Sequence, residues 1–409
     1  MHSSENAAFF GLPPKVQFCR LCVISNQRPS STVEFRNSNS KKETIYFDQS
    51  GVCDACRYHS TKQDTDWSAR EKKLIEILDK YRRNDGGYDC VVPSSGGKDS
   101  SFTAHLLKSK YGMNPLTVTW APNMFTEVGR NNFQGLIDIG GIDNILYSPN
   151  GKVHRLLTKL AFQNLCHPFQ PFIHGQKIIG PRIAKNFNIP LIVYGENQAE
   201  YGNSIHENLS YKMNEKYFSL DNPMEMILGG VKLKDLLNTY NLSLNDFSAY
   251  LPLTTQEIQS SDITVMHLGY FEKWDPQECY YYAAENTGFQ AAPLRSDGTY
   301  SKYTEIDDKI VPFHFYTTLI KFGIGRATYD AAQEIRNGKI TREEGVALVQ
   351  KFDEEFPKTY FNDFLDYIEL SDEEFKTTID EFRSPHLWDH RQNEWVLRHT
   401  VWNENLIIK

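Results

Sequence analysis

The sequence has no excess of basic residues and no long hydrophobic run. Its 409 residues include 44 Lys plus Arg against 52 Asp plus Glu, a formal net charge of -8 at pH 7. Because no basic surplus is available to neutralise a nucleic-acid backbone, a large polyanionic partner is disfavoured. The start MHSSENAAFFGLPPK lacks a basic stretch followed by an apolar core, and no apolar run is long enough to span a bilayer. We therefore expect a soluble, cytoplasmic protein without a membrane span.

Cysteine is scarce, with seven residues in the whole chain. So few cysteines exclude a disulfide scaffold for a chain of this length. Four of them form the pairs CRLC and CDAC, whose thiolates can bind one tetrahedral ion in a closed ligand set, as in structural zinc sites. A redox CxxC, an iron–sulfur site and four unrelated cysteines are the alternatives. The expected Zn²⁺ ligands are Cys19, Cys22, Cys53 and Cys56.

The chain divides into three predicted regions. Residues 1–62 hold the cysteine pairs and form the predicted zinc-binding domain. In residues 63–204, after an amphipathic helix over 67–83, apolar strands alternate with helices. This alternation predicts an α/β fold, a doubly wound parallel sheet covered by helices on both faces. Residues 205–409 are predicted to be mainly helical and to contact substrate or a partner.

Two stretches of the third region carry specific predictions. The stretch PMEMILGGVKLKDLLNTY, residues 223–240, has the pattern of a helix. The polar, aromatic loop RSDGTYSKYTEIDDK, residues 295–309, either covers the cleft of the sheet domain or is ordinary packing.

The stretch PSSGGKDS, residues 93–100, follows a predicted strand and precedes a predicted helix. Its small residues let backbone N–H groups surround an anion at a helix N-terminus. Ser95 and Ser100 add hydroxyl donors, Lys98 adds a positive charge, and Asp99 is placed to hold Mg²⁺ against phosphates. An acidic residue directly after the lysine does not fit the GxxxxGK[ST] loop. The alternative is a glycine turn that binds nothing.

Residues 95–100, SGGKDS, resemble the SGGxDS loop of the PP-loop ATP pyrophosphatases. The resemblance implies that the loop grips the β- and γ-phosphates of ATP, that the bond between the α- and β-phosphates breaks, and that AMP passes to a substrate oxygen. It implies a fold like the adenine nucleotide alpha hydrolases. Thr119 and Trp120, at the end of the second predicted strand, either line the adenine site or belong to the edge of the core. The expected ATP-binding residues are Ser94, Ser95, Gly96, Gly97, Lys98, Asp99, Ser100, Thr119 and Gly195.

Several further stretches resemble the N-acetyl sugar amidotransferases of surface-polysaccharide biosynthesis, the WbpG-like proteins. They include CRLCVISNQRPS, FDQSGVCDACR, HPFQPFIHGQKIIGPRIAK, YGENQAEYGN and FHFYTTLIKFGIGRATYDAAQEIRNGKITREEGVALV. The resemblance implies an ATP-dependent, AMP-forming ligase that converts the N-acetyl group of an activated amino sugar to an acetamidino group, in bacterial lipopolysaccharide O-antigen biosynthesis. An O-adenylyl intermediate would be attacked by ammonia. Because position 2 is His2 and no lone cysteine sits in a nucleophile elbow, the ammonia is expected from a separate glutaminase. The family resemblance implies that this partner is a HisH-like subunit.

Two other stretches hold candidate site residues. In YGENQAEYGN, Glu196 is the candidate for positioning Mg²⁺ or ammonia, and a helix-capping loop with solvated carboxylates is the alternative. In CHPFQPFIHGQ, the histidines and the glutamine either touch sugar or phosphate or are simply packed. The candidate substrate residues are Asn197, Gln198, Glu200, Tyr201, His167, Gln170 and His174.

Two rival functions remain open at this stage. A PP-loop tRNA thiolase also joins zinc knuckles to such a loop, but it must grip RNA and uses reactive cysteines near the ATP site. The acidic charge and the lack of a CxxC after the loop count against it. The second rival is a zinc-bearing adaptor with a degenerate nucleotide fold.

Overall fold

The computed structural model describes the chain except for residues 1–6, 198–199, 201, 206–208 and 405–409. Its strands are β1 (Cys90–Pro93), β2 (Pro115–Trp120), β3 (Asp143–Tyr147), β4 (Leu191–Tyr194), β5 (Ile227–Leu228), β6 (Val231–Lys232), β7 (Thr264–His267), β8 (Trp388–Arg391) and β9 (Glu394–Leu397). The first nine α-helices are α1 (Asp54–Thr61), α2 (Trp67–Tyr81), α3 (Lys98–Ser109), α4 (Glu127–Asp138), α5 (Gly151–Leu165), α6 (Gln170–Asn186), α7 (Leu233–Thr239), α8 (Thr255–Ser260) and α9 (Pro276–Thr287). The others are α10 (Val311–Phe322), α11 (Arg326–Arg336), α12 (Arg342–Phe352), α13 (Phe361–Ile368), α14 (Asp372–Glu381) and α15 (Val401–Glu404).

A five-stranded parallel sheet forms the centre of the fold. Its strand order is β3-β2-β1-β4-β7, and every neighbouring pair is parallel. From β1 the chain moves outward through β2 and β3, then returns to add β4 on the other side. The order therefore reverses between β1 and β4, and ligands bind at the carboxyl ends of strands at such a point. The predicted α/β class with a parallel sheet is confirmed.

Alternate side chains of the strands feed two separate cores, one on each face of the sheet. Val91 and Ile192 pack with the apolar face of α5 and α6. Val92 and Val193 point to the opposite face and pack with α2 and α3. Burial of the strands on both faces explains their continuous apolar sequence.

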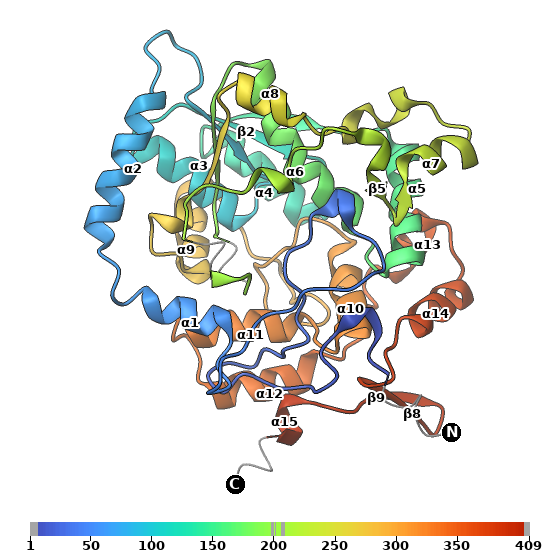
Figure 1. Ribbon diagram of the computed structural model, residues 1–409. Coiled ribbons are helices and arrows are strands. Elements are labelled where there is room, and N and C mark those ends of the chain that lie inside the picture. Colours follow the sequence, from blue (N-terminus) through green and yellow to red (C-terminus); the bar gives the residue numbers. More distant parts are fainter. Residues whose placement is uncertain (1–6, 198–199, 201, 206–208, 405–409) are drawn as a thin grey trace.

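Residues 7–62 lie between the sheet and the C-terminal helices. Figure 1 shows this segment, in blue, passing between α6 and the orange helices α10 to α12. On one side Gln170 of α6 donates to the Glu34 carbonyl at 2.8 Å. On the other side Arg342 of α12 donates to the Cys22 carbonyl at 3.1 Å. The cysteine-bearing segment thus bridges the two larger parts of the chain.

Two findings in the C-terminal region differ from the sequence pattern. The fifth sheet strand, β7, follows residue 204, so the sheet draws on the region predicted to be helical. Residues 223–240 are not one helix, because β5 and β6 form a short hairpin before α7. Gly229 and Gly230 make its turn with φ of 58° and 77°, a conformation that glycine adopts without strain. The rest of this region is mainly helical, as predicted.

Among the residues that the structure describes, no helix combines the length and the apolar character needed to cross a membrane.

Candidate active site

The loop Ser94–Gly97 links β1 to α3 at the point where the strand order reverses. Gly96 has φ 84°, and a Cβ there would lie 2.5 Å from the Phe133 Cα, so only glycine fits. The Gly96 N–H donates to the Ser94 hydroxyl at 3.2 Å, and that hydroxyl donates to Ser100 at 2.9 Å. Its own hydrogen bonds thus fix the loop in shape.

Helix α3 begins directly after this loop and has no side chain that caps its N-terminus. The N-cap residue is Gly97, which leaves the first backbone N–H groups open toward an anion. The Lys98 ammonium lies 2.5 Å from the Asp99 carboxylate. Burial lowers the pKa of Lys98, but the Asp99 carboxylate, which lies against it, and the Glu196 carboxylate oppose this, and the pKa lies above its ordinary value. The lysine is therefore positively charged at neutral pH.

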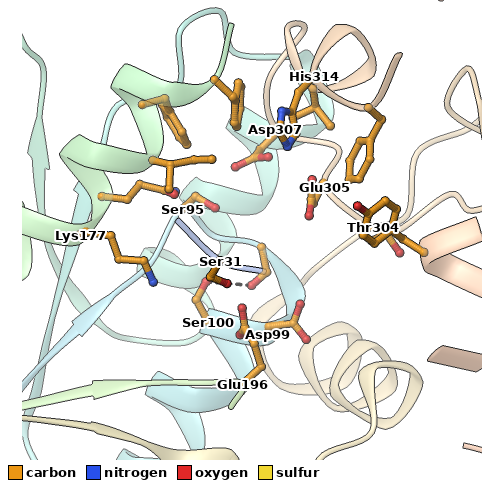
Figure 2. Close-up of a pocket in the computed structure, with 18 of the residues that line it drawn as sticks. Ser31, Ser95, Asp99, Ser100, Lys177, Glu196, Thr304, Glu305, Asp307 and His314 are labelled. Carbon is orange, nitrogen blue, oxygen red and sulfur yellow. Dashed lines mark hydrogen bonds between the residues drawn. The ribbon is translucent and has the colours of Figure 1, made fainter. Parts of the chain in front are cut away.

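A second loop, which begins with Gly195 and Glu196 after β4, lies beside the first. A Cβ on Gly195 would come within 2.8 Å of the Thr103 hydroxyl of α3, so glycine permits this close approach. Burial raises the pKa of Glu196, and the neighbouring Asp99 carboxylate raises it further. The Asp99 carboxylate, in the first turn of α3, and the Glu196 carboxylate thus face one another at the strand ends (Figure 2).

This carboxylate pair fits a hard divalent cation such as Mg²⁺. The Asp99 Oδ1 is buried and has no hydrogen-bond partner among the described residues. A buried carboxylate oxygen without a donor is costly unless a cation occupies it. Asp99 and Glu196 are the residues that would hold the ion.

Both loops open into one cavity of about 590 Å³, a size typical of small-molecule sites. Ser31 of the N-terminal segment, Lys177 of α6 and the loop Tyr303–Asp307 complete its walls. Figure 2 shows Lys177, Asp99 and Glu196 facing this space, with Glu305 across it. The cavity is therefore built from all three predicted regions of the chain.

Glu305, Asp307 and Asp330 form an acidic group of side chains in the wall of the cavity. Burial raises the pKa of Asp307 and of Asp330 in α11. Burial also raises the pKa of Glu305 to about 7, although Arg326 opposes this shift. The Arg326 Nε lies 4.0 Å from Asp330, and its Nη2 donates to the Thr304 carbonyl. This arginine therefore links α11 to the loop that carries Glu305.

Lys177 is a further basic residue that lines the cavity. Burial lowers the pKa of Lys177, and the Glu196 and Glu34 carboxylates oppose that shift. Its ammonium lies 5.1 Å from the centre of the Tyr194 ring at the end of β4. This residue is placed to meet a negative group of a bound ligand.

Several predicted site residues lie around the cavity rather than in it. Thr119 is buried, and its hydroxyl donates to the Ser94 carbonyl at 2.5 Å, so it supports the phosphate loop from inside the sheet. Trp120 does line the cavity. Asn197 is buried with its amide 3.5 Å from the Tyr58 hydroxyl. Glu200 forms a buried ion pair with Lys62.

The three candidates from the start of α6 also differ in placement. His167 lines the cavity, 3.8 Å from the Glu34 carboxylate. Gln170 is fully buried and accepts from the Gly229 N–H at 3.0 Å. His174 is buried with its Nε2 2.7 Å from the Tyr250 carbonyl, and burial lowers its pKa to about 4. Gln170 and His174 therefore hold the fold together. Gln198 and Tyr201 lie outside the described residues.

The four cysteines of the two CxxC pairs converge on one point. All four are buried, and their Sγ atoms lie within 4.8 Å of one another. Cys19 and Cys56 are 3.8 Å apart, as are Cys22 and Cys53. A tetrahedral site with Zn–S bonds of about 2.3 Å has sulfur–sulfur edges of about 3.8 Å, so the cluster fits a zinc ion. The predicted four-cysteine site is confirmed as a cluster that could bind the metal.

The sequence pattern missed several cavity residues. Lys177, Glu305, Asp307 and Asp330 lie in no short motif, and they meet only through the fold. The polar loop at 295–309 was the one signal, because part of it covers the cleft, as one of its two interpretations predicted. Ser31 follows the first cysteine pair closely, and no spacing rule marks it.

Comparisons with known proteins add three findings. Residues 297–401 match the family described as "LPS biosynthesis protein WbpG-like, C-terminal domain". This match confirms the resemblance to WbpG-like proteins over that segment, which includes the acidic wall of the cavity. The uncharacterized protein MJ1599 of Methanocaldococcus jannaschii is 32% identical over 82 residues, 20% of this chain, and the chain spans only 29% of that relative's length. A structure of NMN synthetase from Francisella tularensis covers 56% of this chain and 99% of its own, with 14% identity and a TM-score of 0.26. That likeness is too distant to bear on the fold or the activity.

Proposed function

We propose that this protein is an ATP-dependent amidotransferase of bacterial surface-glycan biosynthesis. It converts the N-acetyl group of an amino sugar, carried on a nucleotide, into an acetamidino group, and it releases AMP and pyrophosphate. The assigned catalytic residues are Lys98, Asp99 and Glu196.

One observation carries this proposal. The same cavity is walled on one side by the SGGKDS loop and on the other by the loop Tyr303–Asp307. The second loop belongs to the segment that matches a lipopolysaccharide biosynthesis family. An ATP-binding loop and a glycan-biosynthesis domain that share one space support a reaction between ATP and a sugar.

The first step activates the amide. The open N–H groups at the start of α3 and the Lys98 ammonium hold the β- and γ-phosphates and stabilise the charge that develops on them. The amide oxygen of the N-acetyl group forms a bond to the α-phosphorus, and the bond between the α- and β-phosphates breaks. Pyrophosphate leaves with the bonding electrons. Mg²⁺ at Asp99 and Glu196 would supply Lewis-acid stabilisation of the same charge.

The second step replaces oxygen by nitrogen. Ammonia attacks the activated carbon, a C–N bond forms, and the bond from carbon to the AMP oxygen breaks. Most free ammonia is protonated at neutral pH and then has no lone pair to attack. A separate HisH-like glutaminase that delivers neutral ammonia to the cavity removes this obstacle.

The cysteines outside the zinc cluster argue against a thiolase. Burial raises the pKa of Cys166 to about 12, and it also raises the pKa of Cys90 above its usual range. Cys279 lies near Lys98 and Asp99, but burial and the acidic neighbours raise its pKa well above the ordinary value. All three are therefore thiols at neutral pH and poor nucleophiles.

Product analysis tests the function. Purified protein is incubated with ATP, Mg²⁺, ammonium and a panel of N-acetylated nucleotide sugars. We expect sugar-dependent release of AMP and pyrophosphate, and a product in which NH has replaced the amide oxygen. Release stimulated by tRNA but not by any sugar would favour the thiolase, and no release at all would favour the adaptor.

A further inference from the structure

Glu305 is placed to take part in the chemistry of the cavity. Its exposed surface faces the cavity, and the cavity walls surround the side chain with protein. Figure 2 shows its carboxylate pointing into the space from the wall opposite Asp99 and Glu196. A ligand held by the phosphate loop would extend across the cavity toward this side chain.

The backbone at Glu305 is held in an unfavourable conformation. Its φ is 45°, in the left-handed region that a glutamate rarely adopts. Two hydrogen bonds from Thr126 fix the residues that follow Glu305. The Thr126 hydroxyl donates to the Ile306 carbonyl at 2.5 Å, and the Thr126 N–H donates to the Asp307 carbonyl at 3.0 Å. Arg326 donates to the Glu305 carbonyl at 3.4 Å. Such strain persists only where the surroundings enforce it.

The Glu305 carboxylate differs from the two acids beside it. The Asp307 side chain is hydrogen bonded to Ser95, and Asp330 accepts from the Thr299 hydroxyl at 2.5 Å. The Glu305 carboxylate has no hydrogen bond or ion pair within the part of the chain that the structure describes. Its oxygens are therefore available to a ligand.

The charges around Glu305 come from three elements. Asp307 lies in its own loop, Asp330 and Arg326 lie in α11, and Lys98 lies in α3. Burial raises the pKa of Glu305 to about 7, and the two aspartates add to this shift while Arg326 and Lys98 oppose it. A group with such a pKa can both accept and release a proton near neutral pH.

The other titratable groups of the cavity are less suited to proton transfer. Asp99 and Glu196 lie at the phosphate loop, where they would hold the cation. His314 of α10 lines the cavity, but burial holds its pKa well below the ordinary value, so it is neutral and a weak base. Among the described residues of the cavity, Glu305 combines an open carboxylate with a position away from the metal.

We propose that Glu305 is a catalytic residue that accepts the proton from the attacking ammonia nitrogen. The proposal rests on the proposed amidotransferase function. When ammonia bonds to the activated carbon, its nitrogen carries a positive charge and cannot form a stable amidine. Transfer of one proton from that nitrogen to the Glu305 carboxylate leaves a neutral amine, whose electron pair then expels AMP. Water recovers the proton from Glu305 after the product leaves.

The test separates the two steps of the reaction in the full-length protein. Glu305→Gln removes the base but keeps the shape of the side chain. Glu305→Asn also removes the base, with a shorter side chain that tolerates positive φ better. Glu343→Gln, an exposed carboxylate on α12, is the matched control. Sugar-dependent exchange of labelled pyrophosphate into ATP reports activation alone, and acetamidino sugar formation reports the whole reaction.

We expect both Glu305 variants to keep exchange within a few-fold of wild type and to lose product formation by about 10²- to 10⁴-fold. At a fixed concentration of neutral ammonia, wild-type product formation should fall as the pH drops below about 7, because protonated Glu305 cannot accept a proton. The variants should lose this dependence.

Three results would overturn the assignment. They are equal loss of exchange and product formation, unchanged product formation, or an unchanged pH profile in both Glu305 variants. Failure of the proposed function looks different, because wild-type protein would then show no sugar-dependent exchange with any sugar, and the role of Glu305 would fall with it.

Discussion

The buried ion pair between Lys62 and Glu200 is expected to control both stability and the active-site loop. Lys62 follows α1 in the cysteine-bearing segment, and Glu200 lies four residues after Glu196. Their side chains are only 2% and 8% exposed. Lys62 also donates to the Trp274 carbonyl at 3.1 Å, and Arg336 donates to the Glu200 carbonyl at 2.8 Å. This pair therefore joins the N-terminal segment to the loop that carries Glu196.

Replacing Lys62 by methionine leaves the Glu200 carboxylate buried without its partner. Removal of one member of a buried pair typically costs about 3–5 kcal/mol of unfolding free energy. The exposed pair Lys376–Asp372, with side chains 65% and 52% exposed, is the matched control. Lys376→Met should cost less than about 1 kcal/mol, because water already solvates both charges. Urea unfolding followed by tryptophan fluorescence measures both variants against wild type.

The penalty of Lys62→Met should depend on pH in a defined direction. Burial raises the pKa of Glu200, and Lys62 opposes that shift, so loss of Lys62 raises the pKa further. The folded carboxyl then binds a proton more tightly than the unfolded one, and stability falls as the pH rises from the unfolded toward the folded pKa. The penalty should be smaller at pH 5 than at pH 8. A penalty equal to that of Lys376→Met, or one unchanged between the two pH values, would refute this reasoning.

Three other changes have definite expected outcomes. Gly96→Ala should abolish AMP formation, because its Cβ meets backbone at φ 84°, whereas Gly338→Ala, with φ 69° and open space around it, should cost about 1 kcal/mol of stability and leave AMP formation unchanged. Cys22→Ser should remove zinc, measured by elemental analysis, and lower the unfolding midpoint, whereas Cys279→Ser should keep its zinc; equal zinc content in both would contradict the assigned cluster. Asp99→Asn should abolish AMP formation while the protein still folds, and activity retained in Mg²⁺ would exclude its metal role.

Local sequence patterns predicted those parts of the fold that depend on local physics. The run PLTVTW predicts a buried strand. The strand β2 spans that run, and every one of its residues is buried. The SGGKDS loop needs only a strand before it and a helix after it, and both are present. The two cysteine pairs lie within reach of one metal ion, as their spacing predicts.

The roles of side chains that contact distant segments of the chain could not be predicted from the sequence. The sequence suggests Gln170 and His174 as substrate ligands, but in the fold both side chains form hydrogen bonds with backbone groups of other segments. Glu305 reaches the cavity only because Thr126 and Arg326 hold its loop there. The environment of a polar side chain is set by tertiary packing, and periodicity carries no information about it.

The central proposal is that the bond between the α- and β-phosphates of ATP breaks. It is tested most directly by identifying the nucleotide product formed from ATP labelled at the α-phosphate, in the presence of Mg²⁺, ammonium and an N-acetylated nucleotide sugar. We expect labelled AMP, formed in equal amount with pyrophosphate and with the acetamidino sugar. Labelled ADP with inorganic phosphate would contradict it, because the loop at Ser95–Ser100 would then serve transfer of the terminal phosphate.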